Sequence, residues 1–110
     1  MIDQTISQIQ ARIQNADTLK EDNKQELLRL LQTLQTEAAE LARTHGEQAQ
    51  SIAGFTQIST HEATRGERDS LLLQHALDGL STSVAGFEKS HPRLVETVNA
   101  FCVTLSNLGI

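Results

Sequence analysis

The stretch "LLRLLQTLQTEAAELARTH", residues 27–45, decides the fold class of this 110-residue chain. Apolar residues recur in it every three or four positions, and a histidine extends the series: Leu27, Leu31, Leu34, Ala38, Leu41 and His45. Alternating steps of four and three place these side chains on one narrow face of an α-helix, a spacing typical of helical bundles and coiled coils. We therefore predict a helix that buries one face against other helices.

Three further stretches repeat this spacing. Their apolar positions are Ile2, Ile6, Ile9, Ile13 and Ala16, then Leu73, Leu77, Leu80, Val84 and Phe87, and finally Val98, Phe101, Leu105 and Leu108. No stretch alternates with the period of two that marks a half-buried strand. We predict an all-α protein, a small antiparallel helical bundle of four main helices with a short helical or irregular segment between the second and third.

The first two helices are predicted to be separate. Thr18-Leu-Lys-Glu21 matches a capping box, in which the Thr side chain caps a helix and the Glu bonds back to it, so residues 15–17 form the connection. An alternative is one helix over residues 2–45, because the apolar spacing continues in phase through Lys20. We favour the break because polar residues crowd this region.

Residues 47–68 are predicted to connect the two halves of a single domain, 1–110. The first half is a helical pair over 1–46, in which Gly46 ends the second helix as a left-handed C-cap. The second half is a helical hairpin over 69–110.

The connection itself has weak helix signals. Gly54, Gly66 and many Ser and Thr interrupt it, and Ser59-Thr-His-Glu62 is a second candidate capping box. We expect it to carry less of the core than the helices do. The third helix then covers about 69–89.

Ser90-His91-Pro92 is predicted to be a corner between the last two helices. The residue before a proline avoids the helical conformation, and proline suits the first turn of a helix. Glu88 and His91 have the Glu-x-x-His spacing of a di-metal motif, which needs two such pairs and two further Glu. Here the two residues fall on opposite sides of a break between helices. We predict no metal and no cofactor.

The stretch "LSNLGI", residues 105–110, has the pattern of a helix end. Gly109 is predicted to adopt the left-handed conformation, and Ile110 to fold back on Leu105 in a Schellman motif. This capped end is expected to close a finished domain.

Composition and charge disfavour several function classes. The net charge is −5 and the chain has neither Trp nor Tyr, so it lacks a basic surface for phosphates and a stacking platform for bases, and nucleic acid is not an expected partner. The single Cys102 lies on an apolar stripe, which predicts a small core residue in a reducing compartment. No secretory signal and no run of about 20 apolar residues is present, so we predict a cytoplasmic protein with no membrane partner.

One motif has a catalytic counterpart. His75-Ala-Leu-Asp-Gly79 resembles the His-x-Leu-Lys-Gly signature of histidine phosphotransfer domains, which are four-helix bundles. The resemblance implies that His75 accepts a phosphoryl group. Asp78, however, stands where that family has a Lys, and a negative charge there repels phosphate. An ordinary exposed histidine is the favoured interpretation, and a phosphotransfer module is the alternative.

The C-terminal third resembles a family of small bacterial proteins of unknown function. Members end in Phe-Glu-x-x-His-Pro-x-Leu followed by Leu-x-Asn-x-Gly-Ile. The matching positions here are Phe87, Glu88, His91, Pro92, Leu94, Leu105, Asn107, Gly109 and Ile110. The resemblance implies a helical protein with no established activity, and residues 47–66 look like an insertion relative to shorter members.

The lengths of the first two helices predict self-association. The second, about 26 residues, spans about 39 Å, whereas the first, about 15 residues, spans about 22 Å. Part of the longer stripe then needs another cover, and a two-fold dimer is the commonest one. We predict a homodimer whose self-association site is Leu27, Leu30, Leu31 and Leu34. The predicted function is a non-enzymatic protein–protein interaction or structural module with an unknown protein partner.

Overall fold

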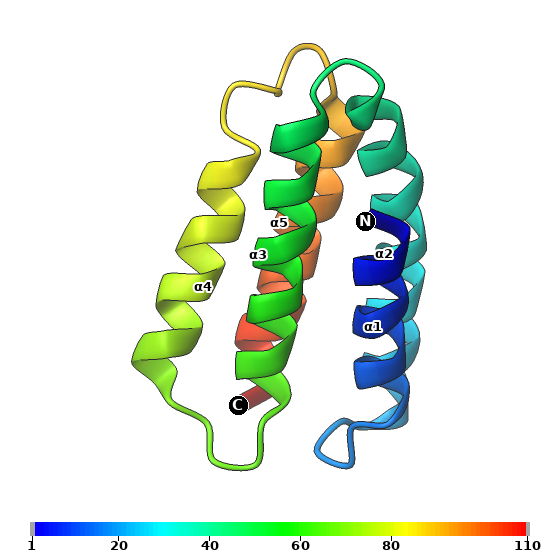
Figure 1. Ribbon diagram of the computed structural model, residues 1–110. Coiled ribbons are helices and arrows are strands. Elements are labelled where there is room, and N and C mark those ends of the chain that lie inside the picture. The colour runs from blue at the N-terminus through cyan, green and yellow to red at the C-terminus, as the bar shows by residue number, and fades with distance from the viewer. Residues whose placement is uncertain (1, 110) are drawn as a thin grey trace.

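The computed structural model describes residues 2–109 and confirms an all-α fold, with no strand among those residues. Five α-helices and a short 3₁₀ helix follow one another: α1 (Ile2–Gln14), α2 (Glu21–Ala42), α3 (Gly46–Thr64), α4 (Ser70–Ser83), α5 (Pro92–Ser106) and η1 (Asn107–Gly109). Consecutive α-helices run antiparallel and are joined by short loops (Figure 1).

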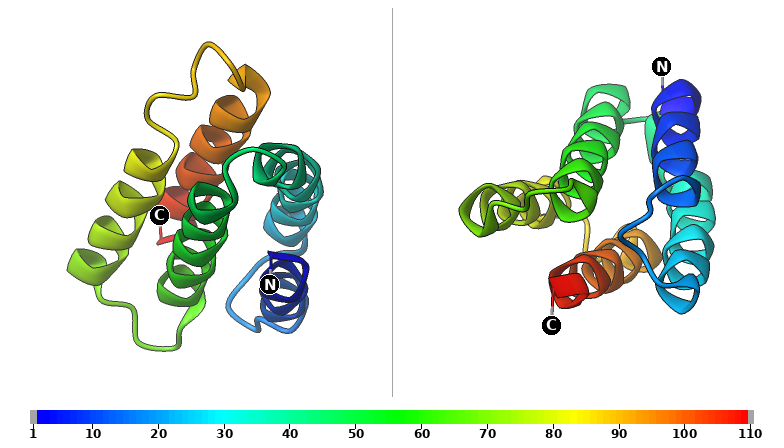
Figure 2. Two further views of the ribbon diagram at one scale, coloured as in Figure 1. Left: turned by 45° about the horizontal axis from the view of Figure 1, so that its top comes forward. Right: turned by 90° about the horizontal axis from the view of Figure 1, so that it is seen from below.

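The helices form three layers, which the end-on view of Figure 2 separates. α1 and α2 make one side, α3 and α5 the middle, and α4 the opposite side. α3 packs against each of the other four α-helices. The core is therefore organised around α3, the helix with the weakest signal in the sequence.

Residues 47–68 differ most from the prediction. Instead of a short or irregular connection, α3 is a 19-residue helix with its own buried face: Ala49, Ile52, Ala53, Thr56, Ser59, Thr60, Ala63 and Thr64. The candidate capping box that begins at Ser59 lies inside this helix. The bundle thus has five helices rather than four and a segment, and the segment carries much of the core.

Hydrogen-bonded threonines explain how α3 can bury a face that contains polar side chains. Oγ1 of Thr56, Thr60 and Thr64 each donates to the carbonyl oxygen four residues earlier, over 2.7, 2.8 and 2.7 Å. A buried hydroxyl that is hydrogen-bonded avoids most of the cost of losing water. These side chains can therefore face the core although they are polar.

The predicted self-association site is corrected by this packing. Its four leucines are at most 5% exposed and belong to the core of a single chain: Leu27, Leu30, Leu31 and Leu34. Residues 47–68, expected to carry less of the core than the helices do, contain most of α3, which packs against α2. A second copy cannot cover side chains that the chain itself already buries. A homodimer as such stays a prediction.

The break between α1 and α2 is confirmed, and a single helix over 2–45 is wrong. The capping box is also wrong, because α2 begins at Glu21 after Lys20, and Lys20 makes no side-chain cap bond. The Thr18 hydroxyl instead donates to the carbonyl oxygen of Thr64 over 3.3 Å. The Thr18 hydroxyl, which the local motif assigned to a helix cap, is thus hydrogen-bonded to a distant residue at the end of α3.

Glycine roles at the helix ends also differ from prediction. α2 ends at Ala42, and Gly46 is the first residue of α3 rather than a left-handed C-cap. Among the residues described, the one in the left-handed region is Gly86, with φ of 97°. It lies after α4, which ends at Ser83 instead of extending to residue 89.

The start of α4 and the corner before α5 agree with the sequence. The Asp69 carboxylate accepts from two amides in the first turn of α4, those of Leu71 and Leu72, a normal N-cap arrangement. Pro92 opens α5, and His91 precedes it. The Schellman contact predicted for Ile110 lies outside the described residues.

None of the helices within residues 2–109 combines the length and the apolar character needed to cross a membrane.

Candidate functional site

α3 exposes two large apolar side chains, Phe55 and Ile58, which are 37% and 50% exposed. Residues three apart lie on the same side of a helix, so we call this pair the α3 ridge. α3 stands between α1 and α4 (Figure 1), and a groove runs on either side of the ridge. The α1/α3 groove, about 440 Å³, includes Ile58, and the α3/α4 groove, about 470 Å³, includes Phe55.

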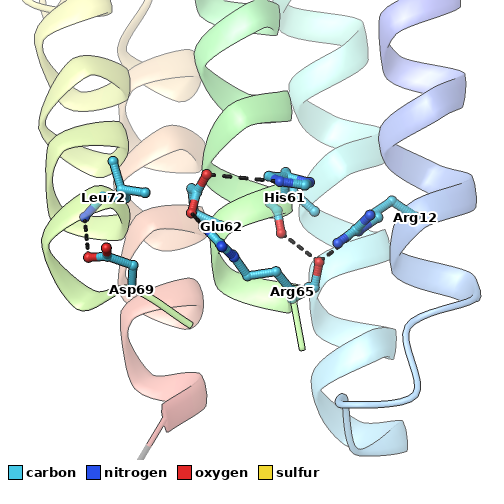
Figure 3. A network of polar contacts seen from close by, with 8 residues as sticks. Arg12, His61, Glu62, Arg65, Asp69 and Leu72 are labelled. Carbon is cyan, nitrogen blue, oxygen red and sulfur yellow. Dashed lines mark hydrogen bonds and ion pairs between the residues drawn. The ribbon is translucent and has the colours of Figure 1, made fainter. Parts of the chain in front are cut away.

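Two polar contacts join α1 to α3 along the α1/α3 groove. Nε2 of Gln57 donates to Oε1 of Gln8 over 2.7 Å. One turn further along α1 and about two turns further along α3, Nε of Arg12 donates to Oγ1 of Thr64 over 2.9 Å, and Figure 3 shows Arg12 reaching across from α1. Because α1 and α3 run in the same direction, the two contacts follow each other in the same order on both helices.

Glu62 occupies the lower end of α3, beside the same groove (Figure 3). Its Oε1 pairs with Nη1 of Arg65 over 2.9 Å, and its Oε2 lies 3.9 Å from Nε2 of His61. The hydrogen bond to Glu62 raises the pKa of Arg65. Glu62 was expected in a capping box at the start of a helix, but it lies in the last turn of α3 and its negative charge is paired with the adjacent Arg65.

Packing in the α3/α4 groove explains why position 79 is a glycine. A Cβ atom at this position would lie 2.6 Å from Cδ1 of Phe55, inside van der Waals contact. The missing side chain therefore makes room for the Phe55 ring. Gly79, which completes the resemblance to phosphotransfer domains, has a packing role in this bundle.

His75 is exposed on α4, as the sequence predicted. Asp78, one turn later, is also exposed, and its Oδ1 accepts from Nε2 of Gln74 over 2.8 Å. The carboxylate of Asp78, which stands where phosphotransfer domains have a Lys, thus lies one turn from His75 on the same exposed side of α4.

Cys102 is half-buried on α5 and packs against the core. Burial, and to a lesser degree Asp78, raise its pKa to about 11, so the thiol stays protonated at neutral pH and is a poor nucleophile.

Glu88 and His91 do not converge: Oε1 of Glu88 accepts from the amide of Gly86, and Nδ1 of His91 bonds the hydroxyl of Ser90. Within residues 2–109 no three His, Cys, Asp or Glu side chains gather as a metal site would require.

Sequence reasoning missed the ridge and the α1/α3 groove. Phe55 and Ile58 fall in the stretch that was expected to be a short helical or irregular connection, while Gln8, Arg12 and Gln57 belong to no motif. A four-residue step from Gln8 to Arg12 shows that both lie on one side of α1. Their partners on α3 are 49 and 52 positions away, and no local pattern shows that pairing.

Comparison with known proteins gave no match to a protein-family model, a curated protein or a solved structure. The resemblance of the C-terminal third to a bacterial family stays a prediction.

Proposed function

We propose that this chain is a non-enzymatic protein–protein interaction module that contacts its partner through the α3 ridge and the grooves beside it. The observation that carries the proposal is the exposure of Phe55 and Ile58 between two grooves. Exposed apolar side chains next to concave surface are typical anchors of protein interfaces.

The position of α3 supports this assignment. Because α3 packs against every other α-helix, the ridge and both grooves are held by the core and need little ordering when a partner binds. A preformed surface avoids much of the entropic cost of association. α3 is thus well placed to present a rigid contact surface.

Site-specific photo-crosslinking tests the proposal. A benzophenone amino acid replaces Ile58 in cells that express the chain natively, and a matched control replaces Val103, which is 57% exposed but lies on α5. We expect a covalent protein adduct from position 58 and none from position 103, with mass spectrometry identifying the captured chain. No adduct at 58, or equal adducts at both positions, contradicts the proposed contact surface.

A second copy of the chain is the first partner to test, because the sequence predicts a homodimer. We propose the α3 ridge in place of the four buried leucines as its interface. Light scattering should then give about twice the 12.1 kDa chain mass, and Ile58→Asp should reduce it toward a monomer. A monomeric wild type at all concentrations rejects the homodimer and directs the crosslinking toward a different protein.

Histidine phosphotransfer is the second candidate, favoured by the exposure of His75 on α4. Incubation with a phosphorylated receiver domain tests it, with His75→Gln as the control. Phosphate uptake that depends on His75 would support this candidate. The carboxylate of Asp78 and the packing role of Gly79 lead us to expect none.

A further inference from the structure

Arg12 is held in a fixed position across two helices. Its Nε donates to Oγ1 of Thr64 over 2.9 Å, and the same hydroxyl donates its own proton to the Thr60 carbonyl over 2.7 Å. A hydroxyl has a single proton, so towards Arg12 it acts purely as an acceptor. This chain of bonds fixes the guanidinium at the edge of the α1/α3 groove (Figure 3).

The charge of Arg12 nevertheless has no partner among residues 2–109. Its two terminal nitrogens take part in none of the hydrogen bonds and ion pairs formed among residues 2–109. The nearby Glu62 carboxylate pairs with Arg65 at 2.9 Å, and Asp17, which lines the adjoining groove with Arg12, forms no ion pair with it. A guanidinium with both terminal nitrogens free presents the fork that binds a carboxylate through two parallel hydrogen bonds.

The groove places two other useful groups beside this fork. Gln8 lies one turn before Arg12, and because its Oε1 already accepts from Gln57, its amide protons remain as donors. Ile58 supplies half-exposed apolar surface to the same groove. A volume of about 440 Å³ is within the range of ligand sites, which combine apolar surface with a few placed polar groups.

We propose that the α1/α3 groove binds a partner segment in which an acidic side chain stands beside an apolar one. The carboxylate pairs with Arg12 and accepts from Gln8, and the apolar side chain packs on Ile58. An amphipathic helix with Asp or Glu at the edge of its apolar face has this chemistry. The inference rests on the proposed function and adds the chemistry of the partner.

Hexanoate, a carboxylate on a short apolar chain, is the probe that tests this assignment. It is titrated into the ¹⁵N-labelled chain while amide chemical shifts are followed by NMR. We expect saturable shifts concentrated on α1 and α3 beside the groove, with a Kd on the order of millimolar for so small a ligand. Hexanamide, the neutral analogue, should produce much smaller shifts.

Arg12→Gln tests the role of the guanidinium. It should weaken hexanoate binding about tenfold or more, the size of one charge-assisted interaction. Arg93→Gln, which removes an exposed arginine from α5, should bind as the wild type does. Amide shifts far from position 12 show whether the Arg12 variant keeps its fold.

Three results overturn the proposal: equal responses to hexanoate and hexanamide, shifts scattered over the whole surface, or full binding by Arg12→Gln. The hexanamide comparison uses the unaltered chain, so the test does not depend on how a variant folds. If hexanoate fails while position 58 still crosslinks to a protein, the acidic partner is rejected and the interaction module stands. If hexanoate binds but position 58 captures nothing, the protein-contact function is rejected instead.

Discussion

α2 and α3 pack against each other in the same bundle, yet they bury faces of opposite character. α2 buries five leucines and one alanine, whereas α3 buries a single isoleucine among alanines, serine and threonines. Large side chains fill the space between helices, and small ones let helix axes come close, because interaxial distance depends on the side chains at the contact. α3 can therefore approach four neighbours at once.

A buried helical face therefore need not be made of large apolar residues. On α2 the burial of apolar surface itself favours folding. On α3 the buried threonine hydroxyls are satisfied by backbone carbonyls of the same helix, and close packing with neighbouring helices is the contribution that favours folding. Mutations should accordingly destabilise the two helices by different routes.

The largest effect is expected from a cavity on α2. Leu34 is fully buried, and Leu34→Ala should lower the free energy of unfolding by about 2–5 kcal/mol. Urea denaturation measures this loss. Leu28→Ala, at a half-buried position on the same helix, should cost clearly less. Equal losses at both positions would contradict the burial difference on α2.

The second-largest loss of stability is expected from adding side-chain volume to the buried face of α3. Ala49 is fully buried, and Ala49→Leu adds volume where helices approach closely, so the free energy of unfolding should fall by about 1–3 kcal/mol. Ala39→Leu, at an exposed position on α2, should stay within about 0.5 kcal/mol of the wild type. An Ala49 variant as stable as the wild type would show that α3 packs more loosely than its small residues indicate.

The smallest effects are expected from two adjacent hydroxyl groups on α3, and they should have opposite signs. The Ser59 hydroxyl is buried without a hydrogen-bond partner among residues 2–109, whereas Thr60 donates to the Thr56 carbonyl over 2.8 Å. Ser59→Ala should raise the free energy of unfolding by about 1 kcal/mol, and Thr60→Val should lower it by about 1 kcal/mol. Thermal and urea denaturation measure both changes.

Ser51→Ala is the control for helix propensity, because Ser51 lies exposed on the same helix and alanine is the better helix former. The gain at Ser59 should exceed the gain at Ser51. Destabilisation by Ser59→Ala would mean that its hydroxyl contributes to packing in spite of lacking a partner.

The sequence correctly predicted the helices that carry large apolar residues at regular spacing. It found α1, α2 and α5, the start of α4 at Asp69 and the corner at Pro92. It failed where a local motif competed with a distant partner, as when Thr18 bonded Thr64 rather than capping α2. The candidate site was missed for the same reason, because the hydrogen bonds of Arg12 and Gln8 join residues of two helices far apart in the chain.

Apolar periodicity and proline geometry act within a few residues, so the amino-acid sequence was enough to predict the all-α class, the apolar face of α2 and the break at Pro92. The central position of α3 depends instead on packing between helices that are far apart in the chain. The same packing covers the leucines of α2 within one chain, and it places the Arg12 guanidinium, which has no charged partner among residues 2–109, at the edge of the α1/α3 groove. Small and hydroxyl-bearing side chains favour a buried face only when neighbouring helices come close enough to pack on them, and such neighbours are supplied by the whole fold.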